Sequence, residues 1–74
     1  MITLQVESET LAALAYDAAR QFLQIQFRDH TIYCYFDVPT DIFQALTQAP
    51  SKGRYFNKSI RPRFRYEKLH SFLS

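Results

Sequence analysis

The sequence predicts a small α+β domain: a three-stranded antiparallel β-meander followed by two short helices and a short C-terminal strand. Two neighbouring segments alternate apolar and polar residues, as half-buried strands do, and a segment that begins at Pro39 repeats apolar residues at helical spacing. With 74 residues, of which 47% are hydrophobic, the chain is expected to fold as one domain over residues 1–74.

The first strand of the meander is expected within LAALAYDAA, at residues 11–19, although this segment could also form a helix. Its alanines favour a helix by intrinsic propensity. A strand fits about as well, with Leu14 and Tyr16 on one face and Leu11 on the other. In that case Asp17–Arg20 forms the turn into the next strand.

The next two strands are expected to form a hairpin with a two-residue turn at Asp29–His30. This register would place Tyr33 and Tyr35 on the face opposite to the apolar one. Tight hairpins prefer glycine at the second turn position, so His30 is expected to bear some backbone strain. The residues assigned to the apolar face are Leu23, Ile25, Phe27, Ile32, Cys34 and Phe36.

Two short helices are expected after the hairpin. Pro39 suits the first turn of the first helix, Asp41 complements its dipole, and Pro50 ends it. Ser51 can cap the second helix, which ends before Pro62. The expected apolar positions are Ile42, Ala45, Leu46 and Ala49 in the first helix and Tyr55, Phe56 and Ile60 in the second.

A final strand is expected within residues 63–69, anchored by Phe64, Tyr66 and Leu69. Asn57 lies in the middle of the second helix, where it lowers helix propensity. We therefore expect its side chain to make a specific hydrogen bond, either to the protein or to a ligand.

Over residues 8–69 the chain resembles the KTSC domain, a family named for its occurrence at the C-terminus of some lysyl-tRNA synthetases. The family also exists as small single-domain bacterial proteins. The resemblance implies a small α+β domain, and RNA binding has been suggested for the family from its attachment to a tRNA enzyme. Three residues depart from the pattern: Ala15, His30 and Pro50. The matching residues are Ser8, Leu11, Leu14, Tyr16, Asp17, Leu23, Ile25, Phe27, Tyr33, Cys34, Tyr35, Val38, Pro39, Ala49, Ser51, Gly53, Tyr55, Phe56, Asn57, Ile60, Arg61, Phe64 and Tyr66.

Charge is distributed unevenly along the chain, whose net charge is +2. The C-terminal third holds most of the lysines and arginines, and in residues 51–66 they alternate with aromatic residues. Cations with interleaved rings are typical of surfaces that bind single-stranded nucleic acid, through phosphate contacts and base stacking. The candidate nucleic-acid-binding residues are Tyr33, Tyr35, Lys52, Arg54, Lys58, Arg61, Arg63 and Arg65.

Each candidate also has a structural interpretation. The two tyrosines can be core residues covered by the helices. Arg61, Arg63 and Arg65 would share one face of an extended segment, where they could track phosphates or simply keep a sheet edge solvated. Arg61 could instead pair with Asp17 or Asp41. The alternative function is a protein-interaction or homo-oligomerising module with no nucleic-acid ligand.

Other classes of function are not expected. No group of residues supplies a nucleophile, a base and an orienting residue together, so we expect no catalytic residues and no enzyme activity. One cysteine and two histidines do not predict a metal site, and no cofactor motif is present. The longest apolar run has six residues, too short for a membrane span. The lone thiol and the absence of an export signal favour the cytoplasm.

Overall fold

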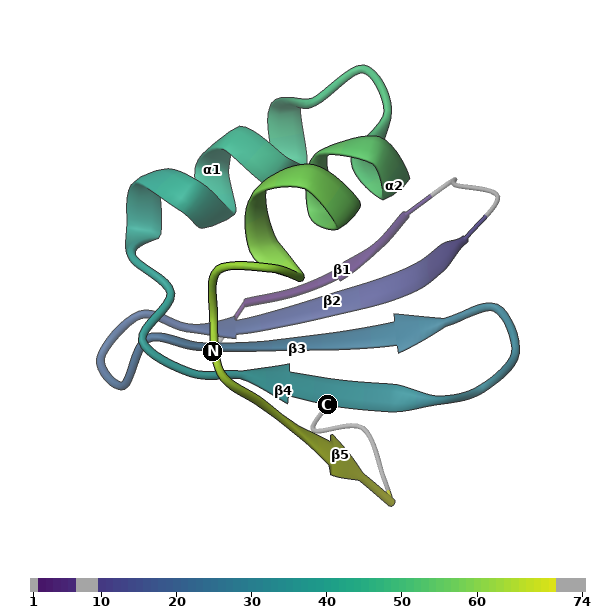
Figure 1. The fold of residues 1–74 in the computed structure, drawn as a ribbon, viewed down its shortest axis with the longest axis horizontal. Coiled ribbons are helices and arrows are strands. Elements are labelled where there is room, and N and C mark those ends of the chain that lie inside the picture. Colours follow the sequence, from purple (N-terminus) through teal and green to yellow (C-terminus); the bar gives the residue numbers. More distant parts are fainter. Residues whose placement is uncertain (1, 7–9, 71–74) are drawn as a thin grey trace.

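A computed structural model describes residues 2–6 and 10–70 and shows an antiparallel sheet with helices on one face (Figure 1). Within these residues the sheet has five strands in sequence order: β1 (Ile2–Gln5), β2 (Leu11–Asp17), β3 (Phe22–Phe27), β4 (Ile32–Tyr35) and β5 (Tyr66–Leu69). The helical segment between β4 and β5 consists of α1 (Thr40–Gln48), α2 (Lys52–Tyr55) and the π-helical turn η1 (Phe56–Ile60).

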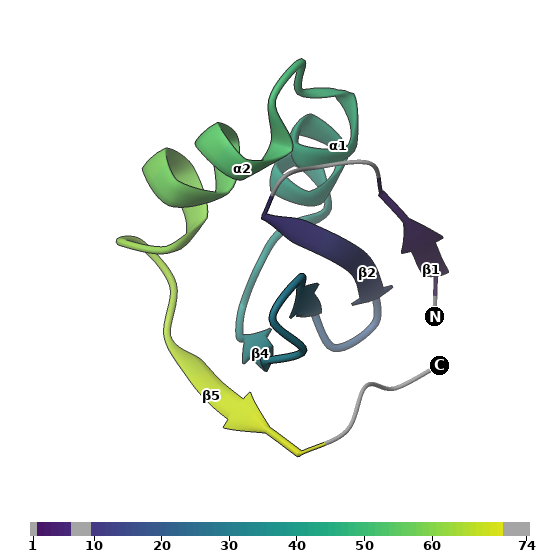
Figure 2. The ribbon, with the colours of Figure 1, turned by 90° about the vertical axis from the view of Figure 1, so that its right-hand side faces the viewer.

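The predicted α+β class is therefore confirmed, but the three-stranded meander understates the sheet. Strand β1, which pairs with β2, was not predicted. The final strand is shorter than predicted and joins the same sheet beside β4. Viewed along the strands, the sheet is twisted, with β1 and β5 at its two edges (Figure 2). Ser8, the first residue of the family pattern, lies outside the described residues.

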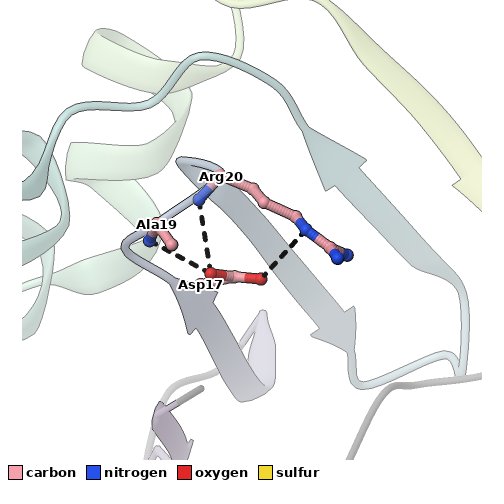
Figure 3. Close-up of polar contacts among 3 residues, drawn as sticks. All are labelled: Asp17, Ala19 and Arg20. Carbon is pink, nitrogen blue, oxygen red and sulfur yellow. Dashed lines mark hydrogen bonds and ion pairs between the residues drawn. The ribbon is translucent and has the colours of Figure 1, made fainter.

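The ambiguous alanine-rich segment is strand β2, and a bulge in it corrects the predicted position of Leu11. Pairing with β3 shifts register between Leu11 and Ala13. The extra residue turns Leu11 onto the face of Leu14 and Tyr16, and all three are buried in one core. As predicted, the turn into β3 begins at Asp17, whose Oδ1 accepts hydrogen bonds from the backbone N–H groups of Ala19 and Arg20 (Figure 3).

The predicted register of the β3–β4 hairpin is wrong by one residue. Leu23 pairs with Tyr35 and Ile25 with Tyr33, because the loop holds three residues, 28–30, instead of two. His30 is the residue with positive φ, at 73°, which closes a three-residue loop of the kind that favours glycine at this position. Tyr33 and Tyr35 therefore lie on the helix-covered face, and Cys34 lies on the other.

The helices pack their apolar faces on this side of the sheet. In α1, Phe43 and Leu46 are buried, and the Phe43 ring stacks on Tyr16 with centroids 4.4 Å apart. Pro39 is the N-cap of α1 and not part of its first turn. Ser51 caps α2 as predicted, since its hydroxyl accepts a hydrogen bond from the Arg54 N–H. Phe56 and Ile60 complete the buried face.

The described residues offer neither a membrane-spanning helix nor a metal-binding cluster. No helix among residues 2–6 and 10–70 is long and apolar enough to cross a membrane. The same residues contain no cluster of three or more histidine, cysteine, aspartate or glutamate side chains that could hold a metal ion.

Candidate functional site

Five aromatic rings form a closed circuit on the helix-covered side of the sheet. In order, Phe27 contacts Tyr33, Tyr33 contacts Tyr66, Tyr66 contacts Tyr35, Tyr35 contacts Phe56, and Phe56 returns to Phe27. The centroids of neighbouring rings lie 5.4–5.7 Å apart. Most of these contacts are edge-to-face, the geometry that the quadrupoles of aromatic rings favour.

The rings line an open cleft of about 490 Å³ between η1, the β3–β4 loop and β5. Tyr35 and Phe56 are buried and form its floor. Phe27 and Tyr33 are partly buried, and Tyr66 is 55% exposed at its edge. The polar lining consists of Thr10, Arg28, Asp29, Thr31, Asn57 and Arg61.

Arg61 brings a cation to the η1 side of the cleft. Because the turn η1 continues directly from α2, Asn57 and Arg61 lie on the same side of the helical segment, and Arg61 Nη1 donates to Asn57 Oδ1 at 3.5 Å. Both side chains are exposed. Burial raises the pKa of Tyr35 to about 12, while the positive charge of Arg61 acts in the opposite direction. Asn57 therefore makes the expected side-chain hydrogen bond, and it does so at the cleft.

The β3–β4 loop brings a second cation to the opposite side. Arg28 lines the cleft and donates through Nη2 to the Val6 carbonyl at 3.2 Å. The neighbouring Asp29 carboxylate accepts hydrogen bonds from the hydroxyl and the N–H of Thr31, which lower its pKa. Lys68 pairs with Tyr33 in the sheet and thus extends from β5 on the same face. Positive charge predominates around the rings.

The cleft brings together three of the predicted site residues: Tyr33, Tyr35 and Arg61. The other predicted cations lie elsewhere. Arg54 and Lys58 are exposed on α2 and η1, and Lys52 donates to the Ala49 carbonyl at 3.4 Å. The Arg63 guanidinium lies 5.6 Å from the centre of the Phe64 ring.

The predicted row of Arg61, Arg63 and Arg65 on one face does not form. Residues 61–64 are folded into a turn, in which the N–H groups of Arg63 and Phe64 donate to the Ile60 carbonyl. Arg65 stacks on Phe36 and pairs with Asp37 at 3.9 Å, on the face that the helices do not cover. Nor does Arg61 pair with Asp17 or Asp41, because its guanidinium donates to Asn57 instead.

The predicted site residues did not include Arg28, Phe27, Phe56 or Tyr66, which line the cleft. Arg28 was overlooked because it lies outside the basic C-terminal third. The three rings were assigned to packing, which they do provide, but they also line the cleft. For Phe27 and Tyr66, the signal that could have found them is the recurrence of aromatic residues at alternate positions of adjacent strands, whereas Phe56 lies in η1.

Cys34 is buried, but it faces away from the helices, and not toward the apolar core as was predicted. It lies between Gln24 and Glu67 in the central part of the sheet. Desolvation, with a smaller contribution from Glu67, raises its pKa. A raised pKa reduces the thiolate fraction on which nucleophilic reactivity depends.

Comparison with known proteins supports one family. Residues 7–64 match the KTSC domain model. The crystal structure of a KTSC domain protein from Yersinia pestis superimposes with a TM-score of 0.88 at 34% identity, covering 92% of this chain and 96% of the other.

Curated relatives fall into two groups by length. A protein of Tsukamurella paurometabola, of which the chain spans 90%, is 42% identical over 60 residues. A lysine–tRNA ligase of Nostoc sp. is 41% identical over 66 residues. The chain spans 89% of its own length in that match but only 12% of the ligase. In the first group the domain makes up nearly the whole protein, and in the second it is a small part of a larger enzyme.

Proposed function

The chain belongs to the KTSC domain family, and from this premise we propose that it binds RNA or another single-stranded nucleic acid through the aromatic cleft. We define the aromatic cleft by the rings of Phe27, Tyr33, Tyr35, Phe56 and Tyr66. We propose a binding module and not an enzyme. We also propose a cytoplasmic location, where reducing conditions suit a lone free thiol.

The observation that carries this proposal is the combination of exposed ring surface with flanking arginines. Tyr66 offers an exposed face at the mouth of the cleft, and Arg28 and Arg61 lie on opposite sides of it. Unstacked bases bind aromatic faces, and guanidinium groups bind phosphates. Aromatic clefts can also hold cations, but the two arginines would repel a cationic ligand.

The relatives add indirect support. The same domain occurs within proteins named lysine–tRNA ligase, and an RNA-binding module suits an enzyme that handles tRNA. Several residues that carry the resemblance to the family, among them Tyr33, Asn57 and Arg61, line the aromatic cleft.

Salt-dependent binding of a mixed RNA library tests the proposal. Contacts by Arg28 and Arg61 to two phosphates predict a slope of about −1.4 in log K against log[salt], at ~0.7 per contact on a single strand. Arg61→Ala should weaken binding and reduce the slope by about 0.7, because one phosphate contact is lost.

Arg20→Ala is the matched control, because it removes the same charge from the β2–β3 turn, at the other end of β3 from the β3–β4 loop that lines the cleft. Arg20 is exposed and pairs with Asp17 at 3.9 Å. The proposal fails if the protein binds no RNA at micromolar concentration and low salt, or if both variants lose affinity equally.

A second candidate function is the addition of a partner strand to β1, because β1 is an uncharged edge strand of the sheet. β1 has no charged residue, and its Ile2 side chain is 50% exposed. Uncharged edge strands can pair with a partner strand or with a second copy of the same chain. Sedimentation of the free protein tests homo-oligomerisation, and Thr3→Lys should return a self-associated form to monomer. A monomer that captures no protein partner would exclude this function.

A further inference from the structure

The orientation of the exposed rings limits what the aromatic cleft can hold. Successive bases of a single strand stack in parallel, so a site for several bases needs several parallel rings. Here the ring planes of Tyr33 and Tyr66 meet at 84°, and those of Phe27 and Tyr33 meet at 76°. The one pair nearer to parallel, Tyr35 and Tyr66 at 35°, includes a buried ring.

A base stacked parallel to the Tyr66 ring would thus lie nearly perpendicular to the Tyr33 ring and could not stack on both. The cleft volume of about 490 Å³ suits a ligand of small-molecule size. Arg28 lines the cleft from the β3–β4 loop and Arg61 lines it from the end of η1, so the two cations are placed for the phosphates that flank one base. Asn57 lies beside Arg61 at the rim of the cleft. Its side-chain amide can hydrogen-bond a base edge there.

We propose that the aromatic cleft is a one-nucleotide site, which takes a single unstacked base and the phosphates on either side of it. This inference rests on the proposed function and narrows it. Most of the binding free energy then comes from one nucleotide. Lengthening the strand beyond three nucleotides therefore adds further positions at which the protein can bind, but few contacts at each position.

Competition against a labelled mixed-sequence RNA dodecamer tests the site size. The unlabelled probes are a mixed RNA trimer, the dodecamer itself and inorganic phosphate, all at one ionic strength. We expect the trimer to bind within about threefold of the dodecamer once the dodecamer's affinity is divided by its number of overlapping registers. Phosphate should compete at least about tenfold more weakly than the trimer, because it cannot stack.

Substitution of the exposed ring identifies the stacking surface. Tyr66→Leu should lower the affinity for the trimer and the affinity for the dodecamer equally, by about tenfold. Tyr55→Leu is the control, since Tyr55 is a partly buried tyrosine outside the cleft. Thermal unfolding of both variants verifies that they fold.

The outcomes separate this inference from the proposed function. A dodecamer that binds while the trimer does not compete overturns the one-nucleotide site and leaves nucleic-acid binding intact. If the trimer and phosphate compete equally well, the cleft is an anion site only, and the one-nucleotide site is also overturned. A dodecamer that does not bind at all overturns the proposed function itself.

Discussion

Tyr35 shows how one residue can serve both the core and the cleft. Its side chain is 3% exposed and contacts both Phe56 and Tyr66 in the ring circuit. Its pKa of about 12 reflects the cost of placing a phenolate in this environment. The hydroxyl therefore stays protonated at neutral pH and can only act as a neutral hydrogen-bonding group.

This pKa predicts a loss of stability at alkaline pH. The folded value of about 12 exceeds the ordinary value of 10.0, so between these values the unfolded chain releases a proton that the folded chain keeps. The stability that Tyr35 contributes is fully present below pH 10. As the pH rises above 10, this group lowers the free energy of unfolding by up to about 1.4 kcal/mol per pH unit. Urea unfolding over this pH range, compared with Tyr35→Phe, measures the effect. Equal slopes in the two proteins would contradict the assignment.

At the residue scale, the sequence did not reveal on which face these tyrosines lie. Tyrosine has an apolar ring and a polar tip, so it satisfies either face of an alternating pattern. Tyr33 and Tyr35 were predicted on the face opposite to the apolar one, whereas in the fold they pair with Ile25 and Leu23. The interpretation that they are core residues holds for Tyr35, which is buried, and in part for Tyr33.

At the element scale, loop length decided the register of the β3–β4 hairpin. The alternation in β3 and β4 was predicted correctly, but alternation alone does not distinguish a two-residue from a three-residue loop. The backbone of His30, at a φ of 73°, allows the longer loop. The one-residue difference reverses which side chains of β4 face the helices. The missed strand β1 has only four residues and no aromatic or charged residue to mark it.

His30→Gly should stabilise the protein. Glycine adopts positive φ without the steric cost that a Cβ imposes, although it also raises the entropy of the unfolded chain. The net gain is expected to be about 0.5–1 kcal/mol, which corresponds to a melting temperature higher by roughly 2–8 °C for a domain of this size. His30→Val should have the opposite effect, because a β-branched residue tolerates this conformation poorly. A lower melting temperature for the glycine variant would contradict this account of the loop.

At the scale of the whole molecule, folding disperses the basic segment that dominates the sequence. Arg61 turns toward the aromatic cleft, whereas Arg65 lies on the other face of the sheet against Phe36. The turn over residues 61–64, which follows the π-helical turn, redirects the chain between these two residues. Charge counts along the chain could predict that cations gather in one segment, but not which of them would meet the rings.

The central position of β4 predicts how Cys34 responds to thiol reagents. Hydrogen bonds hold β4 to β3 on one side and to β5 on the other, and the side chain is 4% exposed. Labelling should therefore require extensive unfolding. With a free energy of unfolding of about 5 kcal/mol, the rate of Cys34 labelling would be roughly three to four powers of ten below that of a free thiol.

A destabilising variant distant from Cys34 tests whether labelling reports on the whole fold. The Tyr16 hydroxyl donates to the Val38 carbonyl at 2.6 Å, and both residues are buried. Tyr16→Phe removes this hydrogen bond and should cost about 1–2 kcal/mol, which would accelerate labelling about 5- to 30-fold if Cys34 is exposed by global unfolding. Urea unfolding supplies the independent free energy. If the labelling rate stays unchanged while the free energy of unfolding falls, β4 opens locally. We do not expect this result, because β4 is paired with a neighbouring strand on both sides.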